Sequence, residues 1–167
     1  MVEASEIAEK IINGEFSSGA ECTFFKLDEK WGLKLYDSEE VRDIAHENHA
    51  YFLKYGLAPD LKRKINLPSF IEKRYGYICE VVEVLIDPVY VYSFEHFHWN
   101  SAYDDFEDAD SWNEHCDDLI NSIMEKYSDE YEELMNKLAQ NDLMYSDDHL
   151  GNFGLKNGKM IIIDFDN

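Results

Sequence analysis

The sequence predicts an α+β chain in which short antiparallel strands precede a mostly helical part. Turn residues divide residues 16–36 into three short segments with alternating apolar side chains, which is typical of strands. Residues 38–56 repeat apolar positions at helical spacing, and so do two acidic segments between residues 105 and 140. An Asn-Gly pair at 157–158 then marks a tight hairpin. We therefore expect a sheet, a set of helices and a final hairpin, in that order.

The first strands are separated by two expected turns, at residues 17–19 and 28–30. The alternation after the second turn places Lys34 among apolar neighbours. Ser38 is a favourable N-cap for the helix that follows, and Gly56 is a favourable stop. This part of the chain therefore predicts three strands and a capped helix.

The middle of the chain predicts two more strands and two helices. Leu67–Glu72 and Tyr75–Leu85 are the expected strands, and the second is apolar enough to be central in a sheet. From Asp105 to Gln140, two amphipathic patterns predict helices that meet near Tyr127 and Ser128. These helices are expected to form a reduced second lobe.

Composition limits the class of protein. The 167 residues are 45% hydrophobic and 14% aromatic, enough for one compact domain or two small lobes. The N-terminus is an acidic amphipathic segment, and the sequence has no long apolar run, so we expect neither a signal peptide nor a membrane span, and a cytoplasmic protein. Widely spaced Cys22, Cys79 and Cys116 indicate reduced thiols. His96 and His98 lack partners in a metal-binding pattern and favour an aromatic edge segment.

The chain is strongly acidic. Thirty-six acidic residues against fifteen basic ones give a net charge of −21, and residues 75–125 hold thirteen acids without a Lys or Arg. Such a field excludes direct nucleic-acid binding through phosphates and attracts Mg²⁺ and basic proteins. The alternative is a surface that serves only solubility. We expect a basic partner, if there is one, to bind the block at residues 103–118.

The chemistry is concentrated in residues 145–167, YSDDHLGNFGLKNGKMIIIDFDN. Asp147 and Asn152 precede the hairpin, and Asp164 follows its apolar second strand. Carboxylate and amide oxygens suit Mg²⁺, which takes few protein ligands and completes its shell with water and phosphate. We expect Asn152 and Asp164 to hold this metal while Asp147 faces a hydroxyl. The alternative is an ordinary hairpin loop rich in Asp and Gly.

These motifs resemble the kinase-like superfamily, and within it the aminoglycoside and choline phosphotransferases and atypical protein kinases more than the animal protein kinases. The branch signature HGDLHxxN, followed by a strand that ends in DFD or DFG, is similar to YSDDHLGN and IIIDFDN in this chain. Tyr145 stands where the family has its first His. The resemblance implies a protein-kinase-like fold with an antiparallel-sheet N-lobe at about residues 1–85 and a truncated, helical C-lobe at 86–167.

The resemblance also implies ATP and Mg²⁺ as cofactors and assigns the site residues. Asp147 would be catalytic, and Asn152 and Asp164 would bind metal. The phosphates would lie against the Gly19 loop and Lys34, and adenine against backbone groups near Glu80 and Val82. Glu47, with Glu40 as the fallback, would hold Lys34. The bland alternatives are a solvent-reaching Lys34, a solvated Glu47 and an ordinary turn glycine at Gly19.

The chain departs from the family at several points. Gly19 is alone in a loop that usually carries two or three glycines, Asp166 replaces the DFG glycine, and no activation segment follows. The compact size resembles the pared-down kinase-like proteins of bacteriophages. Two functions therefore fit: an ATP- and Mg²⁺-dependent phosphotransferase acting on a protein or small-molecule hydroxyl, or a catalytically weak kinase-like protein whose acidic surface inhibits a basic, nucleic-acid-binding partner.

Overall fold

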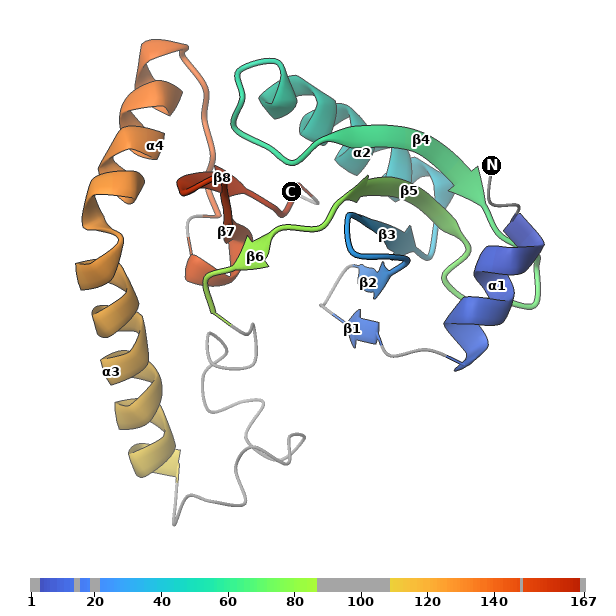
Figure 1. Ribbon diagram of the computed structural model, residues 1–167, viewed down its shortest axis with the longest axis horizontal. Helices are drawn as coiled ribbons and strands as arrows, with labels where there is room; N and C mark the ends of the chain where they lie inside the picture. The colour runs from blue at the N-terminus through green and yellow to red at the C-terminus, as the bar shows by residue number, and fades with distance from the viewer. Residues whose placement is uncertain (1–3, 14–15, 19–21, 87–108, 148, 166–167) are drawn as a thin grey trace. The chain divides into compact units, whose positions relative to one another are not determined.

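The computed structural model describes residues 4–13, 16–18, 22–86, 109–147 and 149–165. This part of the chain is α+β with antiparallel sheets, as the sequence predicts (Figure 1). It divides into two compact units. The first unit is Met1–Val82 together with Ile161–Asn167, and the second is Glu83–Met160. Residues after 160 thus belong with the N-terminal unit, whereas the sequence placed them in the second lobe.

The first unit is built on an antiparallel five-stranded sheet in the order β1-β2-β3-β5-β4. The strands β3 and β5 form its centre and pair over six residues. Their close approach depends on Gly76, because a Cβ there would lie 2.5 Å from the Lys34 carbonyl oxygen. The bounds of the strands are β1 Phe16–Ser18, β2 Thr23–Lys26, β3 Trp31–Tyr36, β4 Leu61–Asn66 and β5 Tyr75–Glu80.

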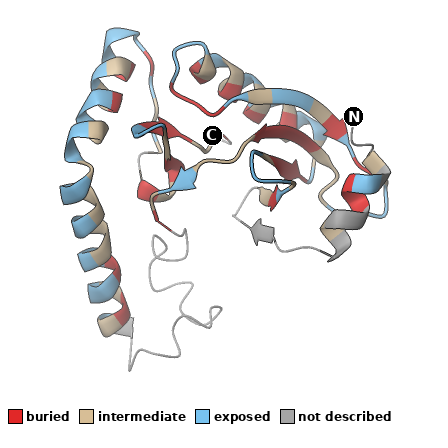
Figure 2. Cartoon of the chain, viewed as in Figure 1, coloured by how far each residue is buried: buried red, intermediate tan, exposed pale blue. Residues whose placement is uncertain are grey.

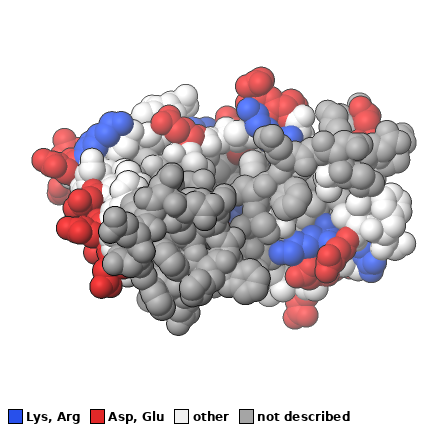
Figure 3. Space-filling view, turned by 90° about the horizontal axis from the view of Figure 1, so that it is seen from below, with Lys and Arg blue, Asp and Glu red and all other residues white. Residues whose placement is uncertain are grey.

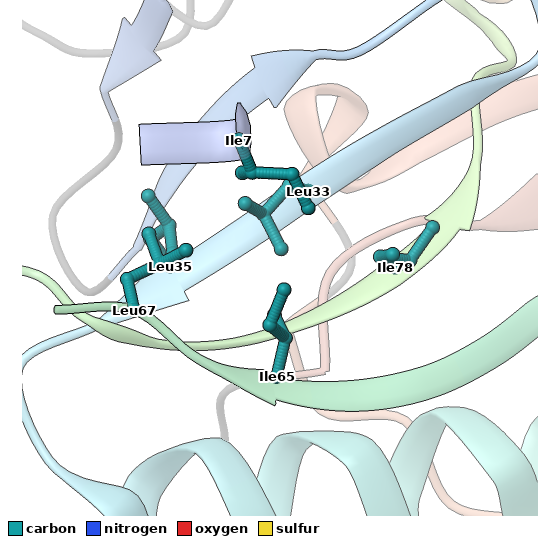
Figure 4. Packing of buried hydrophobic residues seen from close by; sticks show 6 residues of the cluster. All are labelled: Ile7, Leu33, Leu35, Ile65, Leu67 and Ile78. Atoms are coloured by element: carbon teal, nitrogen blue, oxygen red, sulfur yellow. The ribbon is translucent and has the colours of Figure 1, made fainter. Parts of the chain in front are cut away.

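One helix covers each face of this sheet. The helix α1 (Ala4–Asn13) packs Ile7 against an aliphatic cluster (Figure 4). The helix α2 (Glu39–Leu53) packs Ala45 against the other face, which is aromatic. Since side chains alternate along a strand, neighbouring residues of β3 belong to different faces. The aliphatic cluster contains Ile7, Leu33, Leu35, Ile65, Leu67 and Ile78, and the aromatic face contains Tyr36, Ala45, Tyr77 and Cys79.

Local signals in the sequence explain where α2 begins and ends. The Ser38 hydroxyl accepts a hydrogen bond from the Val41 N–H at 3.2 Å, which is an N-cap interaction. Beyond the helix, Gly56 adopts φ +70°, and the Leu57 N–H donates back to the Phe52 carbonyl. The predicted cap and stop are therefore both confirmed.

Three expectations for the strands are wrong. The single strand expected at Tyr75–Leu85 ends at Glu80, and Glu83–Val84 is a separate strand in another sheet. The strand β4 is Leu61–Asn66 instead of Leu67–Glu72, because Pro68 has no N–H and its carbonyl accepts from Ile71 in a turn. The strand's run of basic residues conceals its alternation, as charged side chains do on an edge strand. Ser17 and Ser18, expected in a turn, belong to β1.

The second unit contains two long helices and most of a small sheet. The helices α3 (Ala109–Lys126) and α4 (Ser128–Gln140) follow one another, with hydrogen bonds continuing through Tyr127. Exposed positions recur along both helices (Figure 2), and many of them are acidic. The sheet order is β6-β7-β8. Its strands are β6 Glu83–Val84, β7 Phe153–Lys156 and β8 Lys159–Ile162, and β8 ends in the first unit.

Three further expectations concern the hairpin turn, membrane-spanning helices and the cysteines. Asn157 and Gly158 have φ of 54° and 75°, so the predicted two-residue hairpin turn is confirmed. None of the described helices is long and apolar enough to cross a membrane. The three cysteines are free, and Cys79 and Cys116 are buried.

Candidate functional site

Lys34 lies in the middle of β3 on the sheet face that α2 covers. It pairs with Phe24 of β2 and with Tyr77 of β5. The residue is only 8% exposed, and its Nζ lies 3.0 Å from Asp164 Oδ1. A buried ammonium without a negative partner would incur a large desolvation cost, so this ion pair is what permits a lysine at the position. The alternative of a lysine that extends into solvent is therefore excluded.

Asp164 follows β8 in the first unit and is more accessible than its partner. Its Oδ1 accepts from Lys34 and also from the Phe165 N–H at 2.9 Å. About a third of the carboxylate side chain (34%) is exposed, against 10% of the Lys34 side chain. The carboxylate is therefore the more accessible member of the ion pair.

The helix α2 does not bring Glu47 to Lys34. Its buried residues recur every three or four positions, at Arg42, Ala45, His49 and Phe52, which places Glu47 on the opposite face of the helix. Glu47 and the fallback Glu40 are both exposed. In the described part of the chain, Asp164 therefore takes the role that the sequence assigned to Glu47. That assignment followed the family pattern and overlooked the helical phase.

Asn48 and His49, which follow Glu47 in α2, contact the residue after Asp164, and the sequence did not identify them. The Asn48 side-chain amide donates to the Phe165 carbonyl at 3.1 Å. The His49 ring stacks on the Phe165 ring, with centroids 4.3 Å apart. A polar residue next to a histidine at buried helical positions was the signal available in the sequence. Both contacts hold the residue that directly follows Asp164.

The expected adenine edge lies where the first unit meets the second along the chain, at Val82 and Glu83. The Glu80 N–H donates to the Asp60 carbonyl at 2.8 Å, and the Glu80 carboxylate accepts from the Asp60 N–H. The Val81 N–H donates to the Lys30 carbonyl. The N–H groups of Glu80 and Val81 are therefore both engaged in hydrogen bonds within the first unit.

The thiol of Cys79, which precedes Glu80 in β5, is uncharged. Burial raises its pKa to about 11, although the charge of Lys34 acts in the opposite direction. At neutral pH the thiol therefore stays protonated and unreactive. It contributes packing and does not serve as a nucleophile.

The second unit holds Asp147 and Asn152 in a separate, compact loop. Asn152 is 4% exposed, and its Nδ2 donates to the main-chain oxygen of Asp147 at 3.0 Å. Its own N–H donates to the His149 carbonyl, which closes a short 3₁₀ turn over Leu150–Asn152. His149 Nε2 lies 3.5 Å from Asp147 Oδ1. With Nδ2 fixed, Asn152 can offer Oδ1 to a cation.

The chemistry of these donors fits magnesium. Within the described residues, no group of three or more His, Cys, Asp or Glu side chains could hold a metal. Asn152, in the second unit, and Asp164, in the first, each carry a hard oxygen donor of the kind that Mg²⁺ takes together with water and phosphate. Structural zinc and calcium need fuller protein cages. Gly19, His96, His98 and Asp166 lie outside the described residues.

Comparison with known proteins yields one structure. No family model matches the chain, and no curated protein matches it. Among solved structures it is similar to the ternary complex of streptomycin, ATP and APH(2″)-IIa, an aminoglycoside phosphotransferase. The alignment covers 99% of this chain and 72% of that one, with 17% identity and a TM-score of 0.33. A likeness at this TM-score does not decide the fold, and the function is proposed from the residues of the site.

The ion pair predicts an asymmetric response to mutation. Asp164→Asn removes the negative charge 3.0 Å from the buried Lys34 ammonium and should lower the free energy of unfolding by about 1–3 kcal/mol. Lys34→Met should cost less, because water reaches the third-exposed carboxylate that remains. A double-mutant cycle by urea unfolding should give a coupling energy of about 1 kcal/mol. Zero coupling, or a larger loss from Lys34→Met, would contradict the pairing.

Proposed function

We propose that this protein is a kinase-like phosphotransferase that uses ATP and Mg²⁺ to phosphorylate a hydroxyl group of a protein or a small molecule. The observation that carries the proposal is Lys34, a lysine buried in a sheet and held by a carboxylate that is itself accessible. Burial of an ammonium is costly and is seldom maintained without a function. The loop around Asp147 and Asn152 adds the remaining chemistry.

Each residue of the proposed site has a distinct role. Lys34 and the loop at Gly19 bind the phosphates, and Asn152 and Asp164 hold the metal on the two sides of one hairpin. Backbone groups of Glu80 and Val82 bind adenine. When bound, Mg²⁺ neutralises charge on the transferred phosphoryl group. Glu47 has no role in the proposed site because its side chain is exposed.

Transfer of the phosphoryl group requires one proton acceptor. The substrate hydroxyl oxygen forms a bond to the γ-phosphorus, the bond between the γ-phosphorus and the β–γ bridging oxygen breaks, and ADP leaves. Asp147 accepts the hydroxyl proton. Its backbone is fixed by Asn152, which keeps the carboxylate at a constant place in the loop.

We propose that Lys34 and Asp164 pair with each other when no ligand is bound. Nucleotide phosphates offer Lys34 a new anion, and the metal offers Asp164 a new cation. Because both charges are compensated before and after the exchange, nucleotide and metal should bind together and each should bind weakly alone. This coupling is directly testable.

ATP should stabilise the chain only when Mg²⁺ or Mn²⁺ is present. At one hundred times its dissociation constant, a ligand adds about 2.7 kcal/mol to the free energy of unfolding, which a thermal shift detects. Asp164→Ala should abolish the part of the shift that depends on metal. An equal shift with ATP in chelator and in magnesium would refute the metal site.

Asp147→Asn should preserve nucleotide binding and lower phosphoryl transfer by roughly a hundredfold or more, the usual scale for a positioned general base. The substitution keeps the main-chain oxygen that Asn152 binds, so the loop should remain folded. Transfer of labelled phosphate to the protein itself or to an extract is the measurement. Asp142→Asn, an exposed position with φ 52°, is the matched control. Equal transfer by both variants would remove Asp147 from the mechanism.

A second candidate, a kinase-like binding protein, is favoured by the distribution of charge. Residues 83–160 carry nineteen acidic and four basic residues. Acids at eight positions of α3 and α4 are exposed. On the face drawn in Figure 3, basic side chains lie among acidic ones. A basic partner would be attracted to these helices. The eight positions are Asp110, Glu114, Asp117, Asp118, Glu125, Asp129, Glu132 and Glu133.

Charge reversal at Asp110, Glu114, Asp117 and Asp118 should remove such a partner and leave ATP binding unchanged. Since the Debye length is about 8 Å at physiological salt, capture of the partner from extract should also weaken steeply as ionic strength rises. A wild-type chain without phosphoryl transfer, but with a salt-sensitive partner that the reversed variant loses, would favour the binding function. Retention of every partner by the reversed variant would exclude it.

A further inference from the structure

We infer that α2 serves as the positioning element for the carboxylate of Asp164, with Asn48 and His49 as the positioning residues. The inference rests on the proposed function, in which Asp164 binds the metal. It differs from the role that the family resemblance implies for this helix, which is to hold the lysine through a glutamate. The exposed Glu47 leaves that role to Asp164 itself.

Asn48 acts on Asp164 through one intervening residue. Both backbone groups of Phe165 are held: its N–H donates to Asp164 Oδ1 at 2.9 Å, and its carbonyl accepts from Asn48 Nδ2 at 3.1 Å. The amide of Asn48 therefore fixes the backbone that in turn fixes the carboxylate. Without this hydrogen bond, Phe165 could rotate and carry the Asp164 oxygen away from Lys34.

His49 holds the Phe165 side chain from a rigid position. Its Nε2 lies 2.8 Å from the Pro59 carbonyl, which can only accept, so Nε2 carries the hydrogen. Its Nδ1 is then the acceptor for the Tyr77 hydroxyl at 3.4 Å. The residue is 1% exposed, and its ring stacks on Phe165 at an interplanar angle of 25°. Two polar contacts thus lock the imidazole, and the locked ring fixes Phe165.

The second strand of the hairpin is tied to the same region. The Ile162 N–H donates to the Leu57 carbonyl at 2.9 Å, just beyond the end of α2. The segment that carries Asp164 is therefore bound on both sides, before it by Leu57 and after it by Asn48 and His49. A metal ligand must be held within about 0.5 Å of its productive position, and supporting residues of this kind usually change metal affinity by 10–100-fold.

The test uses the full chain and substitutes residues of α2. Asn48→Ala and the isosteric Asn48→Asp both remove the donor to Phe165. In the presence of ATP, each should weaken Mn²⁺ binding, measured by electron paramagnetic resonance of the free ion, by roughly tenfold or more. Ile44→Ala, at an exposed position of the same helix, is the matched control and should bind as the wild type does. Unfolding in urea checks that all variants are folded.

A second measurement needs no ligand. In the metal-free protein, the amide hydrogen of Phe165 should exchange with solvent at least tenfold faster in both Asn48 variants than in the wild type and in Ile44→Ala. His49→Gln, which can still donate to Pro59 but cannot stack, should also accelerate this exchange.

The possible outcomes separate the inference from the proposed function. Wild-type affinity for Mn²⁺ in both Asn48 variants, or weaker binding in Glu47→Ala but not in Asn48→Ala, overturns the inference. A wild-type chain that binds no metal overturns the proposed function instead. In that case Phe165 exchange still decides whether α2 positions this segment: acceleration supports the contact, and unchanged exchange refutes it.

Discussion

The structure of the first unit depends on one electrostatic constraint, the burial of an ammonium group in the middle of a sheet. Lys34 is flanked by strands on both sides and cannot be solvated where it lies. A negative charge must therefore come from elsewhere, and it comes from Asp164, 130 residues further along the chain. Three features of the fold accompany this ion pair. Residues 161–165 belong to the N-terminal unit, Phe165 contacts α2, and the phase of that helix turns Asn48 and His49 toward Phe165.

The two faces of the sheet are specialised accordingly. The face covered by α1 carries a cluster of buried aliphatic side chains. The face covered by α2 combines Lys34 with two tyrosines, a histidine and a cysteine whose thiol stays neutral. Tyr36 and Tyr77 have hydroxyls 3.5 Å apart, and Tyr77 also reaches His49. Buried polar groups need hydrogen-bond partners in fixed directions, so fewer side chains can be accommodated on this face than on the aliphatic face.

The sequence predicts those features that depend on local chemistry. Ser38 as a cap, Gly56 as a stop, the Asp28 turn and the Asn157-Gly158 hairpin follow from short-range hydrogen bonding and backbone conformation. Alternation also placed Lys34 in a buried strand. The position of β4 was not predictable in this way, since a basic edge strand has little hydrophobic pattern. Nor was the partner of Lys34: a family pattern suggested Glu47, whereas the helical phase and a distant segment determine the pairing. Contacts across 130 residues leave no trace in local periodicity.

The assignment of residues 161–167 to the first unit has a consequence for biosynthesis. The first 82 residues contain five strands and two helices, yet their polar face is incomplete until Asp164 has been translated. At typical elongation rates of about 5–20 residues per second, the nascent sheet waits several seconds with an uncompensated lysine. A frameshift or premature stop before codon 164 would therefore damage a sheet whose lysine is translated 130 residues earlier. Folding of this sheet is thus completed by a segment that is translated long after the strands themselves.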